Sequence, residues 1–224
     1  MINIATVVSA RMGSRRLPGK ALLELGGIPM IEFLLRRLRG SKLGGELIFA
    51  TTERADDDVL ASHVATLGVP VFRGAYDDVA GRYLGVAREF GLNWIVRVTG
   101  DCPFVSASSL DYCLGQLNIS DSVDLATTKG VFPVGIDYEV FSTSTLEVSW
   151  QHMSAEEKEH VTLLFYKQNL GYLLKRFTQP PSWPNLSNCY VVDTLEDLEK
   201  ARRLVQSFDN CHFEVEELLN LQRP

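Results

Sequence analysis

Residues 2–20, Ile2-Asn-Ile-Ala-Thr-Val-Val-Ser-Ala-Arg-Met-Gly-Ser-Arg-Arg-Leu-Pro-Gly-Lys20, decide the fold of this chain. An apolar run from Ile2 to Ser9 leads into a loop rich in glycine and cations, and an amphipathic helix pattern begins at Met30. A buried strand, a loop and a helix in this order form the first step of an α/β domain. The loop then lies at the carboxyl edge of a parallel sheet, where open α/β folds place their ligands.

The composition of the loop indicates an anionic ligand. Four cations and two glycines fall within residues 10–20: Arg11, Gly13, Arg15, Arg16, Gly19 and Lys20. Glycine lets a backbone approach an anion closely, and cations neutralise it. We therefore expect the polyphosphate of a nucleotide here. The alternative is a solvated basic turn, because charge clusters are common at loop tips.

Two familiar nucleotide motifs do not fit the loop. Five residues separate Gly13 from Gly19, where a P-loop has four, and Ala21 follows Lys20, where a P-loop has a magnesium-binding Ser or Thr. The Gly-x-Gly-x-x-Gly fingerprint of dinucleotide-binding domains is also absent. A nucleotide would be bound by a loop of another kind.

The bulk properties exclude several classes of protein. The chain has 224 residues, 46% of them hydrophobic and 22% charged, which suits a single globular domain. Its formal charge is −6, but residues 1–45 carry +6 and the remainder −12, which suits a small anionic ligand and argues against nucleic acid. No apolar stretch approaches the ~20 residues of a membrane span. Four cysteines without metal-ligand spacing read as free thiols, so we expect a cytoplasmic protein.

Strand and helix signals alternate along the first hundred residues. Strands are expected at 2–9, 46–51, 69–73 and 94–99, and helices at 30–39, 56–67 and 79–90. This alternation predicts a mostly parallel sheet with helices on both faces, a three-layer Rossmann-like α/β fold. Further on, strands are expected at 125–128, 136–142 and 190–192, helices at 144–150, 154–168, 195–208 and 214–221, and an extended segment at 177–186.

A carboxylate follows the strand at 94–99, in Arg97-Val-Thr-Gly-Asp-Cys-Pro103. Asp101 would lie at the same sheet edge as the basic loop. Beside a triphosphate, a carboxylate of this kind serves as a magnesium ligand, since Mg²⁺ takes one or two carboxylates plus phosphate oxygens. The alternative role for Asp101 is to cap the next helix.

A second carboxylate follows the expected strand at 190–192, in Val191-Val-Asp-Thr-Leu-Glu-Asp197. Asp193 would be a second metal ligand at the same edge. The alternative is that Asp193 or Thr194 is the N-cap of the following helix.

These motifs together resemble the cytidylyltransferase family, whose members activate 3-deoxy-manno-octulosonate and N-acetylneuraminate. The resemblance is closest to the branch named for spore coat polysaccharide biosynthesis protein F. It runs from residue 2 to about 205 and includes, besides the motifs above, Phe72-Arg-Gly74, Asp77-Asp-Val79, Arg82-Tyr83, Gly135-Ile-Asp-Tyr-Glu-Val-Phe141 and Glu159-His-Val-Thr162.

The resemblance implies a single nucleotidyltransferase domain over residues 1–224, active as a homodimer, with an acceptor-binding or dimer-forming elaboration around 125–185. It implies an enzyme that transfers CMP from CTP to the hydroxyl of a sugar acid, of the 3-deoxy-ulosonic or nonulosonic type. Pyrophosphate would be released, Mg²⁺ would be the cofactor, and the CMP-sugar would serve surface polysaccharide synthesis.

Site residues follow position by position from the resemblance. Catalytic residues would be Arg11, Lys20 and Asp101, and the metal would be held by Asp101 and Asp193. The nucleotide would be bound by Ala10, Arg11, Met12, Gly13, Ser14, Arg16, Lys20, Arg73, Thr99 and Gly100.

Three further residues are candidates for the acceptor. Asp137 and Glu139 alternate with apolar residues, so both are expected on one face of a strand, where they would bind sugar hydroxyls or face solvent or a dimer partner. His160 would face the acceptor, or would be an ordinary histidine on a helix surface.

Two rival functions fit the same motifs. One is a nucleotidyltransferase that uses another NTP with a sugar or polyol phosphate. The other is a non-catalytic nucleotide-binding relative, against which the two metal-binding acids argue.

Overall fold

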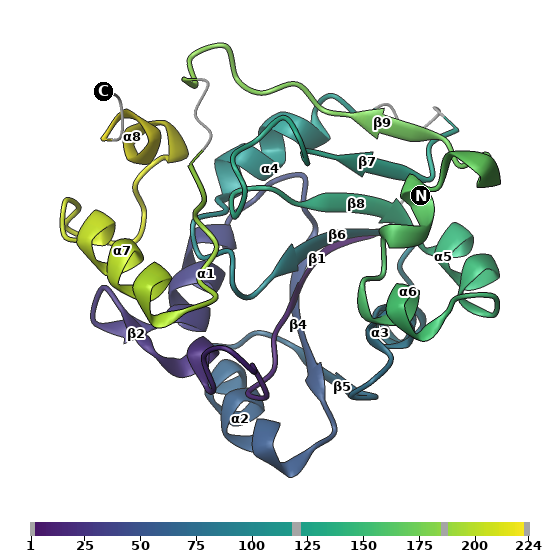
Figure 1. The fold of residues 1–224 in the computed structure, drawn as a ribbon, viewed down its shortest axis with the longest axis horizontal. Coiled ribbons are helices and arrows are strands. Elements are labelled where there is room, and N and C mark those ends of the chain that lie inside the picture. Colours follow the sequence, from purple (N-terminus) through teal and green to yellow (C-terminus); the bar gives the residue numbers. More distant parts are fainter. Residues whose placement is uncertain (1–2, 118–121, 185–187, 222–224) are drawn as a thin grey trace.

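Strand β1 (Ile4–Ser9) lies inside a seven-stranded sheet in the order β5-β4-β1-β6-β8-β7-β9, seen in a computed structural model that describes residues 3–117, 122–184 and 188–221 (Figure 1). β4 (Glu46–Thr52), β5 (Val71–Gly74) and β6 (Trp94–Thr99) continue β1 as a parallel sheet. β8 (Glu139–Ser142) is antiparallel to β6 and to β7 (Leu125–Thr127), while β9 (Leu174–Arg176) runs parallel to β7. The mostly parallel α/β fold predicted from the sequence is confirmed.

Helices cover both faces of this sheet and bury two separate apolar clusters. One face carries α1 (Met30–Leu38), α2 (Asp58–Thr66), α4 (Ala107–Leu114), α7 (Leu195–Val205) and α8 (Val215–Asn220). The other carries α3 (Val79–Phe90), α5 (Thr143–Trp150) and the short α6 (Ala155–Glu159), which packs on α3. β2 (Glu24–Leu25) and β3 (Ile28–Pro29) form a small hairpin before α1.

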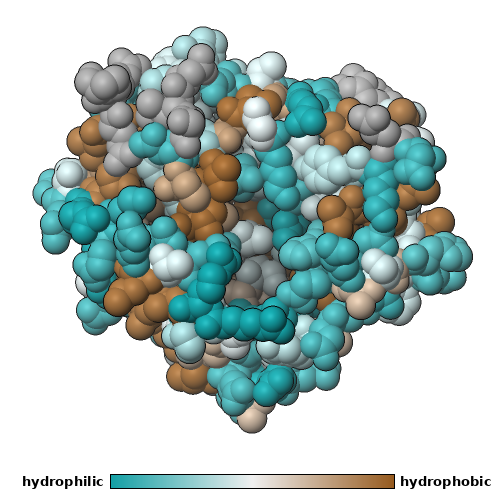
Figure 2. Space-filling model, in the orientation of Figure 1, coloured by the Kyte–Doolittle hydropathy of each residue, from teal (hydrophilic) through white to brown (hydrophobic). Residues whose placement is uncertain are grey.

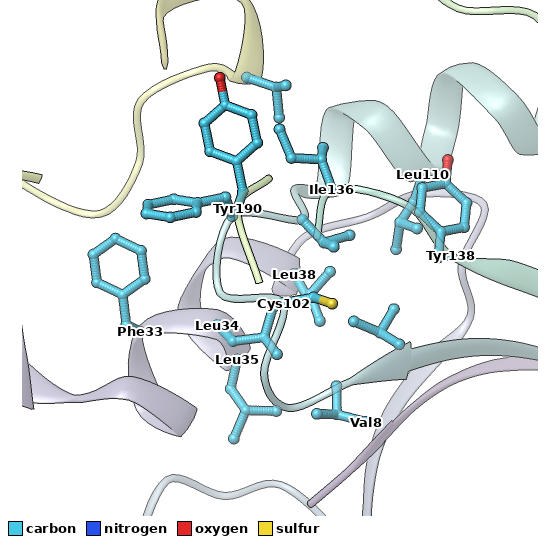
Figure 3. Packing of buried hydrophobic residues seen from close by; sticks show 14 of the residues in the cluster. Val8, Phe33, Leu34, Leu35, Leu38, Cys102, Leu110, Ile136, Tyr138 and Tyr190 are labelled. Carbon is cyan, nitrogen blue, oxygen red and sulfur yellow. The ribbon is translucent and has the colours of Figure 1, made fainter. Parts of the chain in front are cut away.

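Cys102, directly after the Gly-Asp motif, belongs to the first cluster. Figure 3 shows its sulfur among apolar side chains, close to Leu34 and Leu38. Burial raises the pKa of the Cys102 thiol well above its ordinary value. The thiol is therefore neutral, and its role is packing, because nucleophilic chemistry requires the thiolate.

Arg37 of α1 is 4% exposed and ties α1 to the C-terminal part of the chain. Its guanidinium donates to the carbonyls of Cys211 (2.7 Å), Phe213 (2.8 Å) and Phe104 (3.2 Å). Arg37→Met should lower the free energy of unfolding by about 3 kcal/mol, because buried carbonyl oxygens would lose a charged donor. Urea denaturation measures this. The matched change at half-exposed Arg36 should cost less than about 1 kcal/mol, and equal losses in both variants would contradict the assignment.

The helix expected over 154–168 is wrong. α6 ends at Glu159, and Val161 turns the chain with φ of +35°, a conformation that strains a β-branched residue. Two 3-10 helices, Leu163–Tyr166 and Gln168–Leu170, follow. Thr162 donates its hydroxyl to buried Glu139, a contact across the fold that local helix propensity does not include.

Two expected strands also differ. Residues 190–192 form no strand, although Tyr190 N donates to Val134 O and Val192 N to Asp101 O. The strand expected from residue 136 begins at Glu139, which leaves Asp137 in the preceding loop. Three further elements were not predicted from the sequence: β9, α4 and the β2–β3 hairpin. The expected segment 177–186 has no regular structure as far as 184, and its last residues lie outside the described part of the chain.

Candidate active site

A cleft of about 920 Å³ opens at the carboxyl ends of β1 and β6. In the orientation of Figure 1, the surface in Figure 2 is hollowed near the middle of the view, and hydrophilic side chains lie along the lower edge of the hollow. The cleft brings together most of the residues expected in the site: Ala10, Arg11, Gly13, Ser14, Arg16, Lys20, Thr99, Gly100, Asp101, His160 and Asp193. Sequence motifs separated by up to 180 residues thus meet at one edge of the sheet.

Asp57 fixes the shape of the basic loop. Its carboxylate is 2% exposed and accepts the backbone N–H of Met12 at 2.7 Å and that of Thr52 at 3.2 Å. Met12 O in turn accepts the N–H of Gly19, whose φ of +71° suits glycine. Met12 therefore shapes the loop and does not line the cleft. From the sequence, Asp57 was expected only as part of the helix at 56–67, and its role in the loop was not predicted.

Lys20 joins the two acids expected to bind metal. Its Nζ donates to Asp101 Oδ2 at 3.0 Å, Asp193 Oδ1 at 2.9 Å and Val192 O at 3.0 Å, which uses all three of its donors. Burial raises the pKa of Asp101, but Lys20 and the Thr99 hydroxyl outweigh that effect, so the pKa lies below its ordinary value. Both carboxylates converge on one cation.

The donor set fits a metal ion that arrives with a nucleotide. Arg16 adds a second cation, 2.6 Å from Asp193 Oδ2. Within the described residues, no group of three or more His, Cys, Asp or Glu side chains forms a metal cage. Two carboxylates at one point match Mg²⁺, which usually keeps waters and takes further ligands from phosphates.

Arg11 lies on the opposite side of the cleft from Asp193, against α6 and α3. It donates to Glu159 Oε1 at 2.6 Å and to Tyr76 O at 3.2 Å, and its guanidinium stacks on the Tyr76 ring, 4.5 Å from the centroid. Glu159 and Tyr76 were not among the residues expected in the site. The sequence signal for Glu159 was the motif Glu159-His-Val-Thr162 of the family resemblance.

Two further cations that line the cleft were not among the site residues expected from the sequence. Arg82 of α3 is 2% exposed and donates only to neutral oxygens, those of Ser9, Ala75 and Tyr76. Arg97 of β6 points into the cleft from the same strand face as Thr99. Both belong to motifs of the family resemblance, Arg82-Tyr83 and Arg97-Val-Thr-Gly-Asp-Cys-Pro103, which were the available sequence signal for them.

Besides Met12, three expected site residues do not line the cleft: Arg73, Asp137 and Glu139. Arg73 donates to Thr52 O and Arg54 O and pairs with Asp58 at 2.6 Å. Asp137 accepts the N–H of Gly135 at 2.6 Å, and burial raises its pKa. Glu139 is 0% exposed, and partners within the protein occupy both of its oxygens, so it makes no direct contact with a ligand in the cleft.

This fold and this cleft define a nucleotidyltransferase of the α/β class. A family model described as cytidylyltransferase matches residues 5–219. The chain therefore belongs to the cytidylyltransferase family.

Individual relatives agree. The spore coat polysaccharide biosynthesis protein SpsF of Bacillus subtilis is 32% identical over 212 residues, which cover 92% of this chain and 88% of that one. The 3-deoxy-manno-octulosonate cytidylyltransferase of Geobacter sulfurreducens is 30% identical over 196 residues, 78% of this chain and 77% of that one. A solved structure of a cytidylyltransferase from Leptospira borgpetersenii superposes with a TM-score of 0.92 at 28% identity, covering 99% and 94% of the two chains.

The chain is accordingly a CTP-dependent nucleotidyltransferase that transfers CMP from CTP. Among the residues described, no helix is both long and apolar enough to cross a membrane.

Proposed function

We propose that the acceptor is a sugar acid of the 3-deoxy-ulosonic or nonulosonic type, and that the product is a CMP-activated sugar for surface polysaccharide. The observation that carries this proposal is the charge of the cleft. Six cations and four acids line it, and at its α3–β6 side Arg82 donates only to neutral oxygens, so that its charge is available to a ligand. An acidic acceptor would be attracted there, while a neutral sugar would gain nothing from this charge. The printed names of the Bacillus and Geobacter relatives support the same class of product.

We further propose that Asp101 and Asp193 hold Mg²⁺ together with phosphate oxygens of CTP. The metal would supply Lewis-acid stabilisation of charge on the phosphates. Lys20 would then release the two carboxylates and donate to phosphate oxygens, because all three hydrogens of its ammonium group already have partners within the protein. Arg11 and Arg16 would bind the same triphosphate, each after leaving its present carboxylate.

The reaction uses these charges at one step. The acceptor hydroxyl attacks the α-phosphorus in line and an O–P bond forms, while the bond from that phosphorus to the oxygen bridging the α- and β-phosphates breaks and the hydroxyl proton passes to solvent water. Pyrophosphate leaves with the developing negative charge, which Lys20 and Arg11 stabilise. The nucleotide would lie against backbone and small side chains of the cleft, those of Ala10, Gly13, Ser14, Thr99 and Gly100.

The enzyme is proposed to act as a homodimer in the cytoplasm. Exposed apolar side chains of the elaboration at 125–185 offer the partner surface: Val148, Leu163, Leu170 and Leu173. The oligomeric state in solution, measured by light scattering, tests this assignment separately from the chemistry.

Pyrophosphate release tests the function. The enzyme with Mg²⁺ is given CTP, UTP, GTP or ATP in turn, each with 3-deoxy-ulosonic acids, nonulosonic acids, neutral sugars or sugar phosphates. We expect release with CTP and a sugar acid. Release only with a sugar phosphate would contradict the proposed acceptor. CTP binding without release for any acceptor would favour the non-catalytic alternative.

A further inference from the structure

Arg97 lines the cleft with a guanidinium of which one nitrogen, Nη2, is neither hydrogen-bonded to a described residue nor among the buried unpaired nitrogens. Its Nη1 donates to Glu139 Oε2 at 2.8 Å, and Glu139 is its one hydrogen-bond partner among the described residues. Its buried Nε has no partner, and the side chain keeps 15% exposure on the cleft. Nη2 is therefore the nitrogen that can donate a charge-assisted hydrogen bond to a carboxylate in the cleft.

Glu139 is shared between Arg97 and Lys129, and Asp101 is a further anion that raises the pKa of Arg97. Glu139 is ionised, because burial raises its pKa but Arg97 and Lys129 outweigh that effect and lower it overall. Its Oε1 receives the Tyr166 hydroxyl at 2.7 Å and lies 3.1 Å from Lys129 Nζ, while its Oε2 also accepts from Thr162 at 2.8 Å. One carboxylate thus faces two cations.

The same group of side chains places His160 at the cleft. Thr162 is anchored on Glu139 and follows the strained turn at Val161, and this turn holds Glu159 and His160 on the cleft wall. Strain of this kind persists only where the surroundings enforce it, and it is concentrated at functional sites. Arg97 and His160 therefore reach the cleft from one connected structure built on Glu139.

We propose that Nη2 of Arg97 binds the carboxylate of the acceptor sugar acid, and that Glu139 is the residue that positions Arg97. This inference rests on the proposed function, because it requires an acidic acceptor. Arg97 is then the residue that selects sugar acids over neutral sugars, while Glu139 acts through it from a fully buried position.

A comparison of acid and amide acceptors tests the proposal. The ratio of kcat/KM for the sugar acid to that for its carboxamide is measured with saturating CTP, in the wild type and in Arg97→Met. The wild type should favour the acid about 100-fold, because the amide leaves a buried charged donor without its anion. In Arg97→Met the ratio should fall to about 1, with the KM for CTP changed less than about threefold.

Two variants control this experiment. Arg88→Met removes a half-exposed arginine of α3 that pairs with Glu147, and it should leave the ratio unchanged. If Arg97→Met does not fold, the double variant Arg97→Met/Glu139→Gln removes cation and anion together and is measured in its place.

Glu139→Gln tests the positioning role. It should lower the acid-to-amide ratio about tenfold while the rate on the amide stays near that of the wild type. A purely structural role would lower both rates equally.

The outcomes separate the two proposals. A preserved acid-to-amide ratio in Arg97→Met overturns the inference, as does a raised KM for CTP with the ratio intact, which would assign Arg97 to the nucleotide. A wild type that uses sugar acids no better than neutral sugars contradicts the proposed function itself, and with it this inference. That failure is visible before any variant is measured.

Discussion

Asp101→Asn should reduce kcat by about 10³-fold or more while leaving the fold intact. The amide keeps the shape of the carboxylate but lacks the charge that a divalent cation requires of a ligand. Loss of one group that stabilises a developing charge typically costs about 10²–10³ in rate, and here the change also removes a partner of Lys20. Pyrophosphate release with CTP and the acceptor measures kcat.

Stability is expected to change little in this variant. The backbone carbonyl of Asp101, which accepts the N–H of Val192, is unaffected by the substitution, and the side chain is 28% exposed. Circular dichroism and urea denaturation check the fold. Asp209→Asn, which makes the same chemical change at an exposed position, is the matched control. A folded Asp101→Asn enzyme with more than a tenth of wild-type kcat would refute the metal assignment.

Lys20→Ala should lower kcat by about 10²-fold and change the KM of the acceptor by less than threefold. Its ammonium is expected to stabilise the leaving pyrophosphate, whose charge grows in the transition state, so that its loss affects rate and not acceptor binding. Steady-state kinetics with the acceptor varied at saturating CTP separates the two constants. An effect confined to acceptor KM would contradict the role.

Metal affinity gives an independent check on Lys20. In the ligand-free arrangement Lys20 occupies both Asp101 and Asp193, so its removal should not weaken metal binding by the free protein. Titration with Mn²⁺, followed by water proton relaxation, measures this affinity. Lys42→Ala, at an exposed position, is the control for the loss of a lysine.

The parts of the site that could be predicted from sequence are those in which the residue types within one short stretch indicate phosphate binding or metal binding. The basic loop follows β1, Asp101 follows β6, and Asp193 precedes the Thr194 cap of α7; the three meet where an α/β sheet brings the ends of its strands together. Helix α3 and strand β6 have the predicted bounds, because their apolar periodicity is uninterrupted.

The parts that could not be predicted depend on contacts between distant segments. Arg11 meets Glu159 across 148 positions, and Arg97 meets Glu139 across 42. Sequence alternation placed Glu139 correctly on a strand but did not reveal that both of its oxygens are used inside the protein. The end of α6 and the turn at Val161 likewise follow from the anchoring of Thr162, and not from helix propensity.

In the proposed reaction, the enzyme joins CMP from CTP directly to a sugar acid in this cleft. Phosphorus NMR of the products of CTP, Mg²⁺ and a 3-deoxy-ulosonic or nonulosonic acid tests it most directly. We expect one new phosphodiester signal, from the CMP-sugar in which a single phosphate joins cytidine to the sugar, together with free pyrophosphate in equal amount. A coupled pair of diphosphate signals, formed only when a sugar phosphate is the acceptor, would contradict it.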